Sequence, residues 1–207
     1  MKSISEIEEI CKKYGINNYT INEDGSIDVD GDVSLYKKEL TELPLTFNKV
    51  TGDFSCTHNK LTTLKGSPKY VGFGFYCHDN NLTSLEFGPV EVGGDFYCGR
   101  DFSCMDNNFT SLEFSPVEVC RSFYCDGNTK LYNLYGISDN INGLFYCYET
   151  PIESIFNEVD IDFIRAFNVY RVIKDDKVVL KRLKYVMDLF DMRYDLNKIK
   201  KHYEINE

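Results

Sequence analysis

Cysteine and histidine are the residue types in this chain with the most evident chemistry, because both hold metal ions and cysteine also forms disulfides. The 207 residues include eight cysteines and three histidines. No Cys-x-x-Cys pair occurs, and His58, His78 and His202 do not follow a metal-ligand spacing. We therefore expect no metal site and no other cofactor, and we interpret the thiols as structural.

His78 is the centre of a weak candidate for acid–base catalysis, together with Asp79 and Asp53. No phosphate-binding loop, metal-binding motif or nucleophile elbow occurs. No cysteine follows Cys147, so the remaining segment lacks the thiol that a ubiquitin-ligase domain needs. The sequence thus favours a protein that is not an enzyme.

Six of the cysteines recur at a regular interval. Successive members are 21 residues apart, except for one step of 6 and a last step of 22: Cys56, Cys77, Cys98, Cys104, Cys125 and Cys147. A phenylalanine stands two residues before each, and the unit reads V-x-G-x-F-x-C-x-x-N-x-L-x-x-L-x-x-x-P. A period near 20 residues is typical of a solenoid. The pattern predicts an α/β-type solenoid of about six coils over residues 32–157, with short parallel strands and few helices.

The spacing within the unit predicts which side chains are buried. Phe and Cys alternate along one short strand, so both should point into the interior. The leucine-like residues five and eight positions after most of the cysteines should join them. The asparagine three residues after the cysteine can bond backbone groups of its own coil and of the neighbouring coil. Its positions are Asn59, Asn80, Asn107 and Asn128.

The step of six residues looks like a local duplication, in which Asp95–Arg100 precedes the similar Asp101–Asp106. Two phenylalanine–cysteine pairs cannot fill one strand position of one coil. We expect a bulge or protrusion near Gly99 and Arg100. It is either a neutral insertion or a binding finger.

The two ends of the repeat should be covered by caps. In residues 1–31 we expect a helix over 3–14, followed by a hairpin turning at Asp24-Gly25. In residues 158–207 we expect a helical cap, with helices over 162–167, 178–190 and 196–203.

The repeat core F-x-C-x-x-N-x-L resembles the leucine-rich repeat family, and specifically the short repeats of bacterial and phage proteins. The opening, the repeat and the closing segment Leu-Lys-Arg-Leu-Lys-Tyr-Val-Met together resemble uncharacterised leucine-rich-repeat proteins of large tailed bacteriophages. The resemblance covers the whole chain. It implies a fold and a source. It implies no particular activity, because none is established for the family.

The net charge of −10 is unevenly spread. Residues 1–164 carry 12 basic and 26 acidic side chains, and residues 165–207 carry 11 and 7. The acidic solenoid should repel nucleic acid. The basic tail is either a solvated helix face or a cationic patch. The sequence has neither an apolar run of about 18 residues nor an evident signal peptide, so we expect a cytoplasmic protein without membrane contact.

Residues between and beside the buried positions should form an exposed, tyrosine-rich and acidic concave face. We expect it to bind a protein partner, although aromatic ladders also stabilise strands. The predicted binding residues are Tyr76, His78, Asp95, Tyr97, Arg100, Asp101, Met105, Tyr124, Asp126, Tyr146 and Tyr148. The leading hypothesis is a non-catalytic binding module which, if phage-encoded, engages a host or defence protein in the bacterial cytoplasm. The alternative is a virion-associated structural protein. The oligomeric state stays open.

Overall fold

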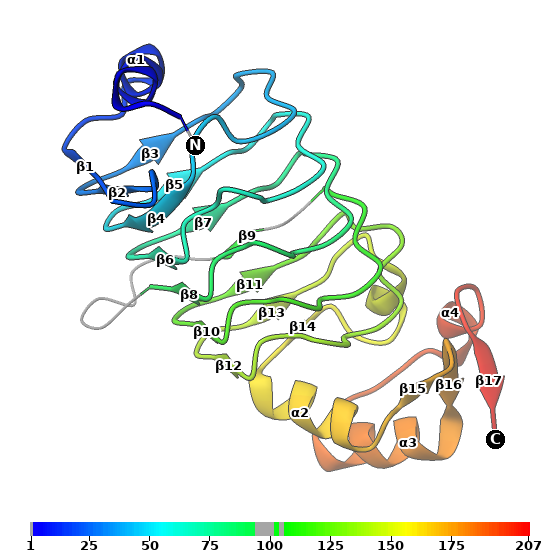
Figure 1. The fold of residues 1–207 in the computed structure, drawn as a ribbon. Coiled ribbons are helices and arrows are strands. Elements are labelled where there is room, and N and C mark those ends of the chain that lie inside the picture. The colour runs from blue at the N-terminus through cyan, green and yellow to red at the C-terminus, as the bar shows by residue number, and fades with distance from the viewer. Residues whose placement is uncertain (1, 94–101, 104–105) are drawn as a thin grey trace.

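The computed structural model describes residues 2–93, 102–103 and 106–207 and shows a β-solenoid with parallel strands (Figure 1). The chain winds through two sheets. Sheet A contains β1 (Tyr19–Ile21), β2 (Ile27–Val29), β4 (Phe47–Val50), β6 (Tyr70–Val71), β8 (Glu91–Val92), β10 (Glu118–Val119) and β12 (Asn140–Ile141). Sheet B contains β3 (Val33–Ser34), β5 (Phe54–Ser55), β7 (Phe75–Tyr76), β9 (Phe102–Ser103), β11 (Phe123–Tyr124), β13 (Phe145–Tyr146) and β14 (Glu158–Val159).

Each coil passes through one strand of sheet A, turns a corner, passes through one strand of sheet B, and returns through a longer segment that carries the leucines. Among the described residues, six such strand pairs follow one another in about five turns. The prediction of short parallel strands is confirmed for β3 to β13 of sheet B, which contain the start of the Phe-x-Cys segments, whereas β14 pairs antiparallel with β13. Sheet A was not predicted, although it contains the valine that opens each repeat.

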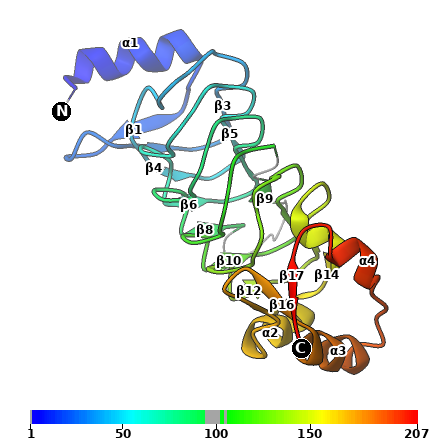
Figure 2. The same ribbon diagram turned by 90° about the vertical axis from the view of Figure 1, so that its right-hand side faces the viewer.

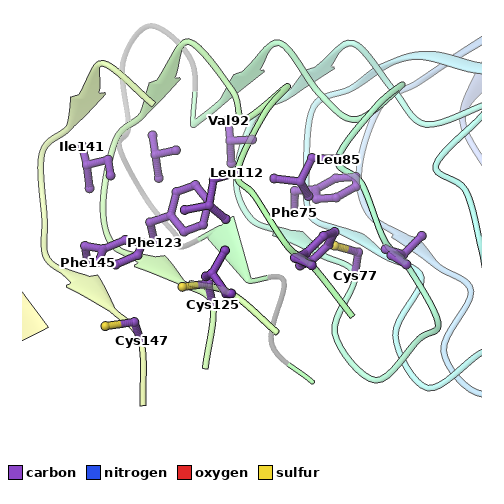
Figure 3. Packing of buried hydrophobic residues seen from close by; sticks show 14 of the residues in the cluster. Phe75, Cys77, Leu85, Val92, Leu112, Phe123, Cys125, Ile141, Phe145 and Cys147 are labelled. Atoms are coloured by element: carbon purple, nitrogen blue, oxygen red, sulfur yellow. The ribbon is translucent and has the colours of Figure 1, made fainter. Parts of the chain in front are cut away.

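The interior is a column of stacked side chains, one layer for each coil (Figure 3). The rings of Phe54 and Phe75 stack with centroids 5.6 Å apart, and those of Phe123 and Phe145 lie 5.7 Å apart. The prediction that the phenylalanines, cysteines and leucines point inward is confirmed at the described positions. Residues with no exposed surface include Phe54, Cys56, Leu61, Leu64, Phe75, Cys77, Leu82, Phe123, Cys125, Leu131, Phe145 and Cys147.

The asparagine ladder is also confirmed. The Nδ2 group of Asn80 donates to the carbonyl oxygens of Cys56 and Cys77, both at 3.0 Å, and its Oδ1 accepts from the Leu61 N–H at 3.0 Å. Asn59 donates to the same Cys56 carbonyl at 2.9 Å. Neighbouring asparagines therefore share acceptors, and the ladder serves buried amide groups that the short strands leave unpaired.

The six-residue slip falls between β8 and β9 along the chain. The corners at 51–53, 72–74, 120–122 and 142–144 each join a sheet A strand to a sheet B strand with three residues, whereas residues 93–101 join β8 to β9. Phe102 is in register with Phe75 on one side and Phe123 on the other. The second copy of the duplicated sequence therefore fills the strand position. The protrusion expected near Gly99 and Arg100 lies outside the described residues.

The N-terminal segment begins with α1 (Ile4–Tyr14) and continues into the β1–β2 hairpin. Ser3 and Glu6 form a capping box at the start of α1, and Gly15 ends the helix in the left-handed conformation at φ 68°. Ile7 and Cys11 are the buried residues of this helix. The predicted helix and hairpin are both present, and β2 pairs in parallel with β4.

The C-terminal segment contains α2 (Ile161–Val169), α3 (Leu180–Leu189) and α4 (Leu196–Ile199), at the opposite end of the solenoid from α1 (Figures 1 and 2). It also contains a three-stranded sheet of β15 (Ile173–Lys174), β16 (Lys177–Val179) and β17 (Glu204–Asn206). The three helices predicted here are present with other bounds, but the sheet was not predicted. Among the described residues, no helix has both the length and the apolar character needed to cross a membrane.

Two helix boundaries differ from the prediction for a local physical reason. Asp175 and Asp176 have φ angles of 51° and 56°, as the two central residues of a type I′ hairpin turn require. The turn pairs β15 with β16, so Val178 and Val179 lie in a strand and the helix starts only at Leu180. The last predicted helix ends at Ile199, because the chain then extends to place β17 beside β16.

Candidate functional site

The outer face of sheet B carries the residues that stand between each buried phenylalanine and cysteine. Among the described ones, Ser55, Tyr76, Tyr124 and Tyr146 are all partly exposed, whereas their strand neighbours are fully buried. The alternation predicted for these strands is therefore confirmed. A row of side chains runs along the solenoid with one residue for each coil.

Tyr124 and Tyr146 form the best-defined part of this row. Their rings are nearly parallel, with an interplanar angle of 2° and a centroid separation of 4.6 Å. This separation matches the distance of about 4.8 Å between neighbouring strands, so the ladder itself sets the stack. The ring of Tyr148 continues the stack 6.5 Å from Tyr146 and is 38% exposed. We call Tyr124, Tyr146 and Tyr148 the tyrosine platform.

Carboxylates border the tyrosine platform. Asp126 accepts a hydrogen bond from the Tyr148 backbone N–H at 2.6 Å, and the Tyr148 hydroxyl donates to Glu158 at 3.4 Å. Partial burial raises the pKa of Asp126, and the negative charges of Asp106, Glu149 and Glu153 raise it further, against the Tyr148 hydrogen bond. A cationic group from a partner would relieve this repulsion.

Tyr76 lies on the same face but is separated from the tyrosine platform by one strand. The register places Ser103 of β9 between Tyr76 and Tyr124. The Tyr76 ring lies over Gly74, where an added Cβ would stand only 2.3 Å from the tyrosine hydroxyl. The other predicted binding residues, Asp95, Tyr97, Arg100, Asp101 and Met105, lie outside the described residues.

A second cluster on this side contains His58, His78 and Asp79. One oxygen of Asp79 lies 2.6 Å from His78 Nδ1 and 3.2 Å from His58 Nδ1. His78 was predicted to act together with Asp79 and Asp53, but the Asp53 carboxylate accepts from the Gly74 N–H. His58 was not predicted as part of this cluster. The signal was present, because residues 58 and 78 are 20 apart and so fall on neighbouring coils.

The cysteines of the ladder are enclosed. Cys56, Cys77, Cys125 and Cys147 have no exposed surface, and burial raises the pKa of Cys56 to about 12. The Sγ–H of Cys125 donates to the Tyr146 carbonyl at 3.2 Å. These thiols pack and form weak hydrogen bonds, as the structural interpretation predicted.

An apolar groove of about 570 Å³ lies at the turns where the leucine segments return to sheet A. Phe87 and Phe114 line it, are 54% and 60% exposed, and both have a φ of 66°. The equivalent turns of neighbouring coils use Gly66 and Gly136. A bulky residue in the left-handed region is unusual. The backbone at both phenylalanines therefore has a conformation that this residue type disfavours. Neither phenylalanine was predicted from the sequence to be part of a site.

Comparison of the chain with protein-family models, with curated proteins and with solved structures gives no match. The surfaces described above are thus the basis for assigning a function.

Proposed function

We propose that this chain is a non-catalytic protein-binding module that recognises a basic or mixed protein surface through the tyrosine platform and its acidic border. The observation that carries the proposal is the parallel, partly exposed stack of Tyr124 and Tyr146, held in place by paired strands. A rigid aromatic surface loses little conformational entropy on binding.

The residue types support recognition of a protein. Tyrosine supplies a large apolar contact area together with a hydroxyl group, and it is enriched among residues that dominate interface energies. The border of Asp126, Glu149 and Glu158 and the net charge of −10 favour a partner with exposed lysine or arginine. Binding of this kind should weaken as salt rises, because the carboxylates at the border are solvent-accessible.

The architecture proposed with this function is a leucine-rich-repeat-like solenoid over 32–157, capped by residues 1–31 and 158–207. The supporting observations are the repeated unit and the additional elements at each end: α1 with the β1–β2 hairpin, and α2 with the β15–β17 sheet. A solenoid whose terminal coils are covered stays soluble and monodisperse. If the chain is phage-encoded, as its resemblance implies, its partner is a host or defence protein in the bacterial cytoplasm.

Affinity capture from a bacterial lysate tests the proposal. The bait is the full chain, and the test variant is Tyr124→Ala combined with Tyr146→Ala. The matched control is Tyr135→Ala, because Tyr135 is 67% exposed but lies on a turn before sheet A. Truncation of one interface hot spot costs about 2 kcal/mol or more, so the affinity for the partner should fall at least about thirtyfold when even one of the two tyrosines is a hot spot.

Three results would distinguish the alternatives. Loss of the partner with an unchanged melting temperature supports recognition. A lower melting temperature with full retention would show that the tyrosines only stabilise the strands. Retention by the tyrosine variant and loss by a Phe87→Gly, Phe114→Gly variant would move the binding surface to the apolar groove.

A further inference from the structure

The cluster of His58, His78 and Asp79 has the composition of a metal-binding site. Two imidazoles and one carboxylate offer ligand atoms that all lie within 4.8 Å of one another. The two histidine rings meet edge to face with centroids 5.5 Å apart. The three residues come from two successive coils, so folding of the repeat is what assembles them.

The backbone holds these ligands in fixed positions. His58 and Asp79 occupy equivalent positions of neighbouring coils, two residues after a buried cysteine, and both have a φ of 55°. The His58 N–H donates to the His78 carbonyl at 3.2 Å, and the Asn59 N–H donates to the Asp79 carbonyl at the same distance. The asparagine ladder lies directly beside them, since Asn80 also donates to the His78 carbonyl at 3.2 Å. Such fixed main-chain positions favour metal binding, because the ligand residues lose little further conformational entropy when the ion binds.

One ligand atom is enclosed without a hydrogen bond. His58 Nδ1 is shielded from solvent and makes no hydrogen bond, although the Asp79 carboxylate lies 3.2 Å away. An enclosed polar atom without a hydrogen bond is costly. A metal ion between this nitrogen and Asp79 would supply the missing interaction.

The distances are close to those of a metal site. In a tetrahedral zinc site with bonds of about 2.0–2.1 Å, two ligand atoms lie roughly 3.3 Å apart. The 3.2 Å between His58 Nδ1 and Asp79 already matches this value, and the 2.6 Å contact between His78 Nδ1 and Asp79 must open by about 0.7 Å to reach it. Both side chains are only partly buried, so they have room to adjust.

We propose that His58, His78 and Asp79 bind one divalent first-row transition-metal ion, with Zn²⁺ as the best fit. Two imidazoles favour zinc, nickel or copper over magnesium and calcium, which prefer all-oxygen sites. Three protein ligands leave one position for water or for a group from another molecule. This inference goes beyond the proposed function, because the site lies beside β5 and β7 and not at the tyrosine platform of β11 and β13.

The test uses the full chain, treated with a chelator and kept reduced with a phosphine. Calorimetry or competition with a chromophoric chelator should show one Zn²⁺ bound per chain, in the micromolar range or tighter. Co²⁺ should give visible ligand-field bands without a thiolate-to-metal charge-transfer band, since the ligands are nitrogen and oxygen. The second readout matters because, among the cysteines that the structure describes, the partly exposed Cys120 is the competing soft ligand.

Three ligand variants and one matched control complete the test. His58→Asn and Asp79→Asn keep residue types that tolerate a positive φ, and His78→Ala removes the third ligand. Each should weaken Zn²⁺ binding at least about tenfold, since loss even of an outer partner of a ligand costs that much. His202→Ala, which changes the remaining histidine, should leave binding unchanged.

Three outcomes would overturn the proposal. They are binding no tighter than about 1 mM, equal affinity in the ligand variants and the wild type, or a Co²⁺ spectrum with the thiolate band that disappears in Cys120→Ser. Circular dichroism of each variant establishes that it is folded, so a lost site is separated from a lost fold.

Discussion

Replacing Asn80 by alanine tests how the solenoid satisfies its buried backbone. The Asn80 side chain accepts from the Leu61 N–H and donates to the Cys56 and Cys77 carbonyls. Leu61 is fully buried, so its N–H would be left without an acceptor. The two carbonyls would be weakened less, because Asn59 and Asn107 also donate to them.

The cost follows from these contacts. An orphaned buried N–H costs about 1–3 kcal/mol, and each of the two weakened carbonyl interactions adds about 0.5–1 kcal/mol. We expect Asn80→Ala to lower the free energy of unfolding by about 2–5 kcal/mol, a large part of the 5–15 kcal/mol typical of a domain. Asn80→Asp should cost at least as much, because it keeps the acceptor oxygen but sets a carboxylate against the two carbonyl oxygens.

The neighbouring residue supplies the control. Asn81 is exposed, and its replacement by alanine should change the free energy of unfolding by no more than about 0.5 kcal/mol. Urea unfolding followed by far-ultraviolet circular dichroism compares the three variants with the wild type. Equal unfolding midpoints for Asn80→Ala and Asn81→Ala would refute the assignment of a structural role to the ladder.

Three other predictions concern the thiols, the slip and the exposed turns. In the native protein a thiol reagent should label the partly exposed Cys120, and it should label Cys56, Cys77, Cys125 and Cys147 only after unfolding. Peptide mass mapping would show this order, and rapid native labelling of Cys77 would contradict the inward packing. Deleting residues 95–100 leaves three residues between β8 and β9, which is the length of the other corners, so the melting temperature should stay the same or rise. An unfolded product would show that these six residues belong to the core. Phe114→Gly should leave the melting temperature unchanged or raise it, because φ is 66° at this position. Gly136→Ala should lower the melting temperature, because the new Cβ would lie 2.4 Å from the Glu113 Cα. The opposite order of melting temperatures would show that the Phe114 ring is needed for folding.

The core was predictable because its signal repeats. Phe75 and Cys77 alternate along a strand, and every coil presents the same pair, so periodicity shows both the fold and the buried face. Asn80 was predictable for the same reason. Sheet A was not, because a strand such as β6 buries only Val71, and no second buried residue two positions away completes an alternation.

The remaining differences come from geometry that a linear pattern does not express. The β15–β16 hairpin depends on the left-handed conformations of Asp175 and Asp176, where a glycine would have been the usual signal. His58 and His78 follow no ligand spacing along the chain, and they meet only because neighbouring coils stack. The predicted tyrosine-rich face is interrupted where Ser103 of β9 lies between Tyr76 and Tyr124, and the predicted Tyr97 lies outside the described residues.

The most direct test of the proposed function is site-specific photo-crosslinking from the tyrosine platform. A photoreactive phenylalanine analogue is placed at Tyr148 in one bait and at Tyr135 in the other, since both side chains are exposed but only Tyr148 belongs to the platform. After irradiation in bacterial lysate, the Tyr148 bait should form a discrete covalent adduct with a protein partner, and the Tyr135 bait should not. An adduct from Tyr135 alone, or equal adducts from both positions, would contradict recognition by the tyrosine platform.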